Sequence, residues 1–537
     1  MKRQTVLCGA VWLMLSAIAA KLLGAVFRIP LTAMLGGTGL GYYSCAYGIF
    51  LPVFALSVTG INAAVAALTA SALAKEDAEQ AFGIERTAKR MFRIAGLCGS
   101  ILLFFLAKPL CRYLLHNPQA EPAVRMFAPA VWFCCESAVL RGLYEGRQNM
   151  IPTAVSQTAE GIARLFCGLL LSSLVLHHPV QALRFFPSGT AVEAAAAAAA
   201  VLGVTISAGA GTGILLLFRI PERRRFRRIP LSSERRREYR HMLSALLIPV
   251  SAASLVTNLT TLIDLGTCLR GLSGAVLGNP AAFGLSPDSA AAEADALANF
   301  YYGAYTGLAV TVFNLVPAVT NMLGKAVLPA FAEQAAQNHT AQMQKHAEDV
   351  LRRTAFLAVP AGLGVMILAN PILQFLFASR ELETEIASPA LSLLGIALIF
   401  TALSCPLFSM MQASGHAGDA VTAMLYGAGV KLAGNLLLIP KMQLRGAALS
   451  TLLCYLTIFL GSRYLFCRRT GLQLRLGAAC GRALFAGLCC SAAAGTLYRK
   501  LAVLPQRPAL LLSIAGGGVV YLLLMLLPVS KAVSPAD

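Results

Sequence analysis

Apolar residues dominate this chain in long runs that short charged or Pro/Gly-rich segments separate. A run such as AGLCGSILLFFLA, residues 95–107, shows no alternation of apolar and polar positions, so it predicts a helix and not a strand of a membrane barrel. A helix needs about 20 mostly apolar residues to cross a bilayer core of roughly 30 Å. The pattern therefore predicts an all-α integral membrane protein with about 14 transmembrane helices. They cover approximately residues 5–26, 42–73, 91–107, 123–143, 151–176, 194–218, 242–266, 298–322, 354–378, 386–411, 417–439, 444–466, 477–498 and 508–529.

Composition and charge support a membrane protein and indicate its orientation. Hydrophobic residues make up 57% and charged residues 13% of the 537 residues, and the mean hydropathy is +0.69, values that exclude a water-soluble globule. With the N-terminus in the cytoplasm, most of the 44 Lys and Arg residues fall in cytoplasmic loops, which predicts a cell-membrane protein with both termini inside. The net charge of +20 is then explained by basic residues that are retained on the cytoplasmic face, near anionic lipid headgroups. Nucleic acid is therefore not an expected partner.

A basic segment divides the chain into two halves that resemble each other. PERRRFRRIPLSSERRREYRH, residues 221–241, forms this division. The stretch GYYSCAYGIF from Gly41 resembles NFYYGAYTGL from Asn299, and GRQNMIPTAVSQTAEGIARLF from Gly146 resembles GHAGDAVTAMLYGAGVKLAGN from Gly415. A parallel duplication of two pseudo-symmetric six-helix bundles is therefore predicted. Its parts are an N-terminal bundle 1–220, a cytoplasmic linker 221–241, a C-terminal bundle 242–467, and two additional helices with a tail at 468–537.

Polar side chains recur on one face of four predicted helices. Insertion of a charged side chain at the bilayer centre costs roughly 2.5–3.5 kcal/mol. Such helix faces should therefore be directed toward other parts of the protein or toward a water-filled cavity. Arg binds phosphate oxygens with a planar fork and Lys supplies a point charge, whereas carboxylates can pair with those cations or bind a coupling proton or Na⁺. The candidate substrate-binding residues are Lys21, Arg28, Gln157, Glu160, Arg164, Asn258, Asp264, Lys431 and Asn435.

Structural explanations for these residues also stand. Arg28 precedes Ile29-Pro30 and can extend to the headgroups, and Glu160 can neutralise Arg164 four residues later. Asp264 can be a polar residue at a helix end, and Lys431 can bond a loop or helix carbonyl.

Motifs for other chemistries are missing from the sequence. The 14 cysteines contain no C-x-x-C, the seven histidines are scattered, and no G-x-x-x-x-G-K-[ST] occurs. GGTGLG, residues 36–41, joins two predicted helices and does not follow a strand, so it does not indicate phosphate binding. We therefore expect no catalytic residues, no metal and no cofactor, and a protein that is not an enzyme.

Three stretches resemble a known family. They are AAKLLGAVFRIPLTAMLGGTGLGYYSCAYGIFLPVFALSVTGI, PTAVSQTAEGIAR and VKLAGNLLLIPKMQLRGAALSTLLCY. The chain resembles the stage V sporulation protein B and polysaccharide-flippase branch of the multidrug/oligosaccharidyl-lipid/polysaccharide exporter superfamily, a branch similar to the lipid II flippases of cell-wall synthesis. The resemblance implies two six-helix bundles around a central cavity, two C-terminal helices, and alternating access that moves an undecaprenyl-diphosphate-linked sugar to the outer leaflet.

The expected partners follow from that resemblance. They are a lipid-linked oligosaccharide such as lipid II, membrane lipids and a possible coupling ion, H⁺ or Na⁺. The protein is expected to be a monomer.

Two other functions remain open. A multidrug-type cation-coupled antiporter should show an acidic cavity, yet four cations and two acids are named above. A membrane-embedded glycosyltransferase should group carboxylates near one face, and the loop 269–297 contains only scattered ones. The sequence does not determine the sugar, the coupling ion, or a role in vegetative wall, spore cortex or capsule.

Overall fold

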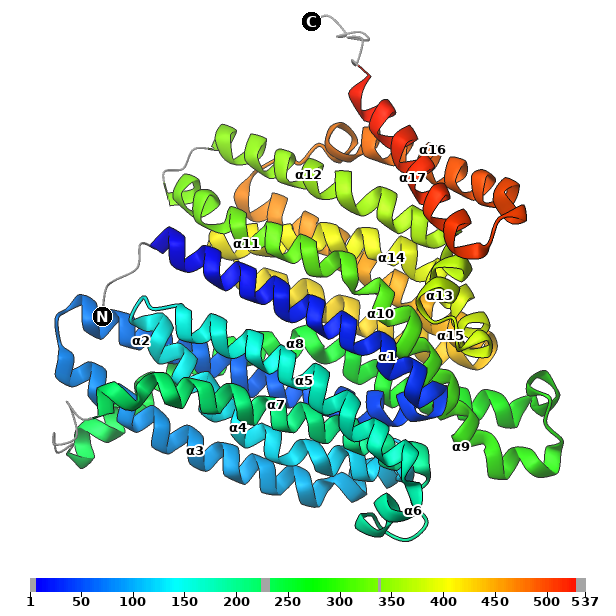
Figure 1. The fold of residues 1–537 in the computed structure, drawn as a ribbon. Coiled ribbons are helices and arrows are strands. Elements are labelled where there is room, and N and C mark those ends of the chain that lie inside the picture. The colour runs from blue at the N-terminus through cyan, green and yellow to red at the C-terminus, as the bar shows by residue number, and fades with distance from the viewer. Residues whose placement is uncertain (1–5, 224–231, 337–339, 528–537) are drawn as a thin grey trace, which may run out of the picture. The chain divides into compact units, whose positions relative to one another are not determined.

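The computed structural model describes residues 6–223, 232–336 and 340–527, and these are almost entirely helical, without a strand (Figure 1). The expected all-α membrane fold is confirmed. Residues 224–231 of the predicted basic linker lie outside the described residues.

By packing, the chain divides into two compact units, Met1–Gly307 and Leu308–Asp537. The first unit contains α1 (Val6–Phe54), η1 (Ala55–Thr59), α2 (Gly60–Ala74), α3 (Ala78–Pro109), α4 (Glu121–Gly146), α5 (Ile151–His177), α6 (Pro179–Ala182), α7 (Val192–Arg223), α8 (Ser233–Gly278) and α9 (Pro287–Ala304). The second contains α10 (Val310–Phe313), α11 (Leu315–Ala336), α12 (Thr340–Ile367), α13 (Ala369–Leu376), α14 (Glu381–Ala413), α15 (Ala417–Thr470), α16 (Leu476–Lys500) and α17 (Gln506–Leu526). The π-helical turn η6 (Tyr305–Ala309) lies at the division. Packing and internal repetition are different criteria, so the predicted boundaries at 220, 241 and 467 stay a prediction.

Two of the longest helices are hairpins. In α1, Gly36 has a φ of 62° and a ψ of −175°, and in α15, Gln443 has a φ of 52° and a ψ of −129°. Arg28 Nη2 lies 3.5 Å from Ser44 Oγ, although sixteen residues of straight helix would separate them by about 24 Å. The chain therefore reverses at Gly36, and α1 has a first arm before it and a second arm after it.

The same argument applies to α15. Lys431 Nζ donates a hydrogen bond of 2.9 Å to Thr451 Oγ1, twenty residues later in the chain. Straight helix would place these residues about 30 Å apart, so α15 also folds back on itself.

Ten segments of the described chain are long and apolar enough to span a membrane, or up to eleven if one bent pair counts as a single span. Two of them, Leu22–Ala74 and Ala417–Thr470, contain the hairpins and can each cross twice. The helix α8 is not among the ten. The expected number of fourteen transmembrane helices is therefore not confirmed.

Small residues allow α9 to touch the second arm of α1. A Cβ atom added to Gly303 would lie 1.9 Å from the carbonyl oxygen of Gly37, so the two backbones are in contact. Asn299 Nδ2 donates to the carbonyl of Thr38 at 2.9 Å, and Asn117 Nδ2 donates to Asn299 Oδ1 at 2.7 Å. The GGTGLG segment thus forms a turn and a helix contact.

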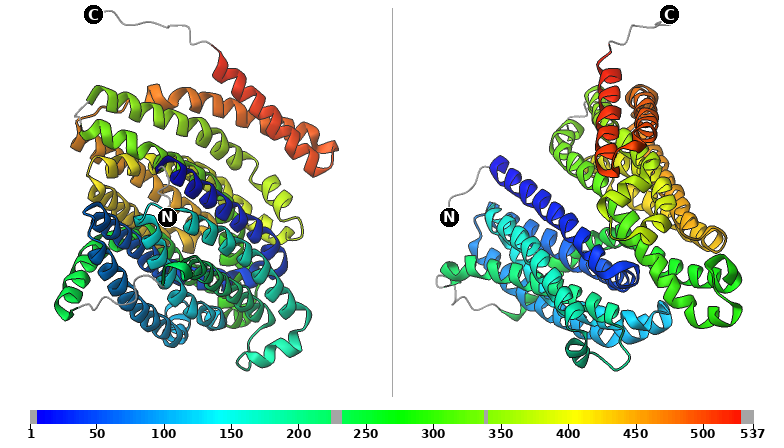
Figure 2. Two further views of the ribbon diagram at one scale, coloured as in Figure 1. Left: turned by 60° about the vertical axis from the view of Figure 1, so that its left-hand side comes forward. Right: turned by 45° about the vertical axis from the view of Figure 1, so that its right-hand side comes forward.

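In the second unit the last two helices extend the bundle at α12. Figure 2 shows α16 and α17 side by side, and Tyr521 Oη of α17 donates to the Phe356 carbonyl of α12 at 2.9 Å. Gly487 of α16 allows the approach of Val359.

Candidate functional site

One group of buried charges in the first unit surrounds Glu160 on α5. Arg141 Nη2 of α4 lies 2.8 Å from Glu160 Oε2, and Arg164 Nη2, one turn further along α5, lies 3.5 Å from Glu160 Oε1. The side chains of Arg141 and Glu160 are 7% and 15% exposed, so this pair is largely removed from solvent. Each oxygen of the carboxylate therefore interacts with a different arginine.

Two tyrosines of the second arm of α1 continue this group toward Arg28. Tyr47 Oη lies 3.4 Å from Arg164 Nη1, and the ring centroids of Tyr47 and Tyr43 are 5.4 Å apart. The guanidinium carbon of Arg28 lies 5.3 Å from the centroid of the Tyr43 ring, a cation–π distance. We call the six residues Arg28, Tyr43, Tyr47, Arg141, Glu160 and Arg164 the arginine–tyrosine cluster.

Arg28 occupies a different electrostatic environment from the other two arginines. Its Nη2 donates to the Thr306 carbonyl at 3.1 Å and lies 3.5 Å from Ser44 Oγ, and both partners are neutral. Within the described residues its Nε is buried and has no hydrogen-bond partner, and the same is true of Arg164 Nε. Three arginines and one glutamate give the cluster a formal charge of +2 that no described carboxylate balances.

Local sequence explains how the cluster forms. Pro152 begins α5 at a position where its missing N–H is not needed, and Gly161 lets Leu23 of the first arm of α1 approach α5. Gly211 of α7 leaves room beside Glu160 Oε2, which a Cβ there would approach to 3.3 Å. The charged face of α5 is thus enclosed by α1, α4 and α7.

Several of the predicted residues lie in or beside this cluster. Arg28, Glu160 and Arg164 belong to it, and Glu160 also forms the ion pair with Arg164 that was the structural alternative. Gln157 lies one turn earlier on α5, and its Oε1 accepts from Ser16 Oγ of α1 at 3.3 Å. Lys21 is on the first arm of α1, but its side chain lies outside the described residues.

The predicted residues of α8 lie on a different helix of the same unit. Asn258 Nδ2 donates to the Ser254 carbonyl of its own helix at 2.9 Å. Asp264 is half-buried, and the next residue, Leu265, packs against Gly48 in the second arm of α1.

The predicted residues of α15 lie in the second unit. Lys431 is 2% exposed and donates to Thr451 Oγ1 at 2.9 Å, while its backbone carbonyl accepts from Ser450 Oγ. Asn435 is 1% exposed on the same helix. The lysine bond crosses the hairpin to a hydroxyl, whereas the structural alternative for this residue named a carbonyl.

Sequence reasoning missed Arg141, Tyr43 and Tyr47. Arg141 falls inside the predicted span 123–143, so a cation in an apolar run was an available signal. The tyrosines were noted only as part of a repeat, because nothing in a linear pattern shows which aromatic ring will lie over which arginine.

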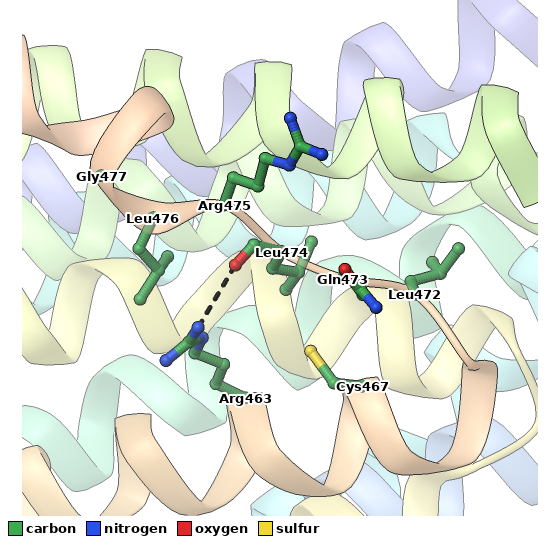
Figure 3. Close-up of a pocket in the computed structure, with 8 residues that line it drawn as sticks. All are labelled: Arg463, Cys467, Leu472, Gln473, Leu474, Arg475, Leu476 and Gly477. Atoms are coloured by element: carbon green, nitrogen blue, oxygen red, sulfur yellow. Dashed lines mark hydrogen bonds between the residues drawn. The ribbon is translucent and has the colours of Figure 1, made fainter. Parts of the chain in front are cut away.

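A cavity in the second unit is remote in sequence from the cluster. It has a volume of about 550 Å³ and lies between α15 and the segment that leads into α16 (Figure 3). Arg463 Nη2 donates to the Leu474 carbonyl across it at 3.3 Å, and the side chain of Arg475 points the other way. Among the described residues no group of three or more His, Cys, Asp or Glu side chains could hold a metal ion.

The fold defines a class of protein: a multi-pass helical membrane protein. The family model described as "Polysaccharide biosynthesis protein" matches residues 6–334, more than half of the chain, and the chain belongs to this family. The model described as "Lipid II flippase MurJ" matches residues 292–505.

Relatives and solved structures agree with that assignment. The chain is 24% identical to stage V sporulation protein B of Bacillus subtilis strain 168 over 84% of this chain and 81% of the relative. It is 23% identical to the lipid II flippase MurJ of the same organism, over 87% and 84%. A structure of lipid II flippase MurJ in an inward closed conformation has a TM-score of 0.64 at 16% identity, covering 97% of this chain and 98% of that one. An inward-facing multidrug MATE transporter of the MOP superfamily has a TM-score of 0.63 at 13% identity, over 84% and 94%.

These comparisons confirm the resemblance to the stage V sporulation protein B and lipid II flippase branch. The chain is a multi-pass membrane protein of the flippase class, and like its relatives it is not an enzyme.

Proposed function

We propose that the protein moves an undecaprenyl-diphosphate-linked sugar, a peptidoglycan or polysaccharide precursor such as lipid II, from the cytoplasmic to the outer leaflet by alternating access. The observation that supports this most directly is Arg28, a half-buried cation whose described hydrogen-bond partners are neutral, connected through Tyr43 and Tyr47 to Arg164. A diphosphate supplies the anionic oxygens that this cluster lacks, and a guanidinium can bind them through two parallel hydrogen bonds.

The roles of the individual residues follow from their charge. Arg28, Arg164, Lys21 and Lys431 hold the diphosphate during the transport cycle, and Glu160 keeps Arg141 and Arg164 in place while the site is empty. Gln157, Asn258 and Asn435 offer amides to the sugar, and Asp264 sets the charge on α8. The lipid tail stays in hydrocarbon throughout. Both termini lie in the cytoplasm, and the protein works as a monomer.

A cation-coupled drug antiporter is the second candidate, because a multidrug MATE transporter shares the fold. The excess of positive charge in the cluster favours an anionic substrate over a cationic drug.

Transport by the purified protein in lipid vesicles tests the proposal. Lipid II, a second undecaprenyl-diphosphate oligosaccharide and an undecaprenyl-monophosphate sugar are compared, with a cationic dye as the drug-type substrate. We expect transport of the diphosphates and much slower transport of the monophosphate. Transport of the dye with no movement of any diphosphate lipid would instead establish the antiporter.

A further inference from the structure

The cavity of the second unit combines a guanidinium with apolar walls. It lies beside the end of α15, where Gly471 leaves the helical conformation with a φ of 71°. Arg463 and Cys467 line the cavity from α15, and residues 472–477 form the opposite wall (Figure 3). A Cβ added to Gly477 would meet no atom within 4 Å, so there is open space beside this residue.

Arg463 gives the cavity a positive charge without a carboxylate partner. Its Nη2 donates to the Leu474 carbonyl at 3.3 Å, and its Nε is buried and has no hydrogen-bond partner among the described residues. The described residues that line the cavity include no Asp or Glu. Buried polar atoms are normally hydrogen-bonded, so a buried guanidinium nitrogen without a partner indicates that an acceptor binds there.

Two carboxylates contact this part of the chain, and both are bound to other groups. Asp419 of α15 forms an ion pair with Arg469 at 3.0 Å. Glu348 of α12 accepts from the backbone N–H of Arg475 at 3.2 Å and from Gln344 Nε2 at 3.5 Å. These bonds attach the segment between α15 and α16 to its neighbours and leave the charge of Arg463 unbalanced.

The first turn of α16 adds the positive end of a helix dipole to the opposite wall. This helix begins at Leu476, and the structure shows neither a side-chain cap at its N-terminus nor an acidic residue in its first turn. Leu476 and Gly477 of this turn both line the cavity. Backbone N–H groups at a helix N-terminus bind anions, and a guanidinium binds phosphate oxygens through parallel hydrogen bonds. The two walls together therefore suit a phosphate group.

The apolar surroundings favour a phosphate that belongs to a lipid. Leu472 and Leu474 are buried in the wall of the cavity. Within one turn of Arg463 on α15, the side chains of Leu460 and Tyr464 are 49% and 63% exposed, as expected where a helix faces lipid. A tyrosine near the end of the predicted span 444–466 is typical of the headgroup level of a membrane. A free phosphate ion would gain nothing from these apolar side chains.

We propose that the cavity binds the phosphate of an anionic phospholipid from the cytoplasmic leaflet. The phosphate oxygens accept from Arg463, including its Nε, and from the N–H of Gly477 at the start of α16. The glycerol and the first acyl carbons lie along the leucines of the wall. The leaflet follows from the predicted orientation, which retains the basic residues at this end of α15 in the cytoplasm. This binding site does not depend on the transported substrate that is proposed above.

Lipid binding to the full-length protein in detergent tests the site. Native mass spectrometry counts the lipids that stay bound during titration with phosphatidylglycerol or with phosphatidylcholine, which has a phosphate but no net charge. We expect the wild type to bind one phosphatidylglycerol more tightly than phosphatidylcholine. Loss of a charge-assisted hydrogen bond should make this binding about tenfold weaker in Arg463→Gln, whereas Arg463→Lys should recover only part of it.

Arg468→Gln is the matched control for the titration. It removes the same charge from the same end of α15, but Arg468 is exposed and is not among the residues that line the cavity. Its affinity for phosphatidylglycerol should equal that of the wild type. Equal affinities for the wild type and Arg463→Gln would disprove the site.

Cys467 provides a second measurement, because its thiol lines the cavity. In a variant with Cys467 as the only cysteine, phosphatidylglycerol at ten times its dissociation constant should slow the reaction with a maleimide about tenfold, since it leaves about one site in eleven empty. An unchanged rate would show that the lipid does not enter the cavity. Protection by millimolar inorganic phosphate without lipid would overturn the assignment to a phospholipid. Gel filtration checks folding, and the Cys467 reaction decides the outcome if Arg463→Gln does not fold.

Discussion

At the scale of single residues, ion pairing in the arginine–tyrosine cluster separates two arginines that contact a carboxylate from one, Arg28, that does not. Arg141 and Arg164 share the two oxygens of Glu160, whereas Arg28 faces a serine hydroxyl, a backbone carbonyl and an aromatic ring. Removing one partner of a buried pair leaves a charge without compensation, which costs far more than loss of an exposed pair. The two kinds of arginine should therefore respond differently to substitution.

Glu160→Gln should destabilise the protein, because it leaves Arg141 and Arg164 without a carboxylate. Breaking a buried pair costs about 3 kcal/mol, whereas Glu79→Gln, which removes the carboxylate of the exposed pair with Arg235, should cost no more than about 1 kcal/mol. Thermal unfolding in detergent measures both. Equal melting temperatures for the two variants would show that Glu160 is not a structural counter-ion.

Arg28→Lys should impair transport of a diphosphate lipid although the charge is retained. A charge-assisted hydrogen bond contributes about 1.5–3 kcal/mol, so loss of the planar fork should reduce the rate roughly tenfold or more. The rate is measured in vesicles at matched protein amounts, with Arg125→Lys as a control outside the cluster. A wild-type rate for Arg28→Lys would mean that Arg28 only anchors its helix at the headgroups.

At the scale of elements, glycines determine how closely neighbouring helices of the first unit pack. The contact of α9 with the second arm of α1 is one of backbone on backbone, because a side chain at Gly303 would collide with the carbonyl of Gly37. The two hairpins depend on one residue each, Gly36 and Gln443, at which the backbone leaves the helical region. Short polar bonds, such as that of Asn299 with the Thr38 carbonyl, fix the register.

Gly303→Ala should destabilise the first unit by about 3 kcal/mol, because overpacking a close contact forces the backbones apart. Gly274→Ala is the matched control, since it also lies within a helix but a Cβ there meets nothing within 4 Å. That change should be neutral or stabilising by up to about 1 kcal/mol. Melting temperatures of the two variants in detergent compare them directly, and a stabilising Gly303→Ala would contradict the described contact.

At the scale of the whole molecule, the distribution of basic residues predicts the orientation. Retention of Lys and Arg in the cytoplasm places the start of α8 inside and the turn before α9 outside. Ser233 and Ala281 mark these two places, and both are exposed.

Single cysteines at Ser233 and Ala281, in a variant without the 14 native cysteines, should react differently with an impermeant thiol reagent. In intact cells we expect labelling of Ala281→Cys and protection of Ser233→Cys, because the reagent cannot cross the bilayer. Permeabilised cells provide the control, in which both positions should react. The reverse pattern in intact cells would invert the topology.

The sequence by itself determined the helical class, the membrane location and the family. These depend on long apolar runs and on local motifs, and a run of about 20 apolar residues has no other stable structure in a bilayer. It also identified Arg28, Glu160 and Arg164, because a charge within an apolar helix is conspicuous without any knowledge of its neighbours.

The tertiary structure alone decided which charges on different helices are paired. Arg141 lies nineteen residues before Glu160, and Tyr43 and Tyr47 lie more than a hundred residues before Arg164, so their contacts arise only when α1, α4 and α5 pack together. The same is true of Glu145 on α4, which accepts hydrogen bonds from Asn62 of α2. Helical periodicity reports the face of one helix, whereas an ion pair between helices depends on which faces meet. The close packing of side chains and glycines determines which faces meet.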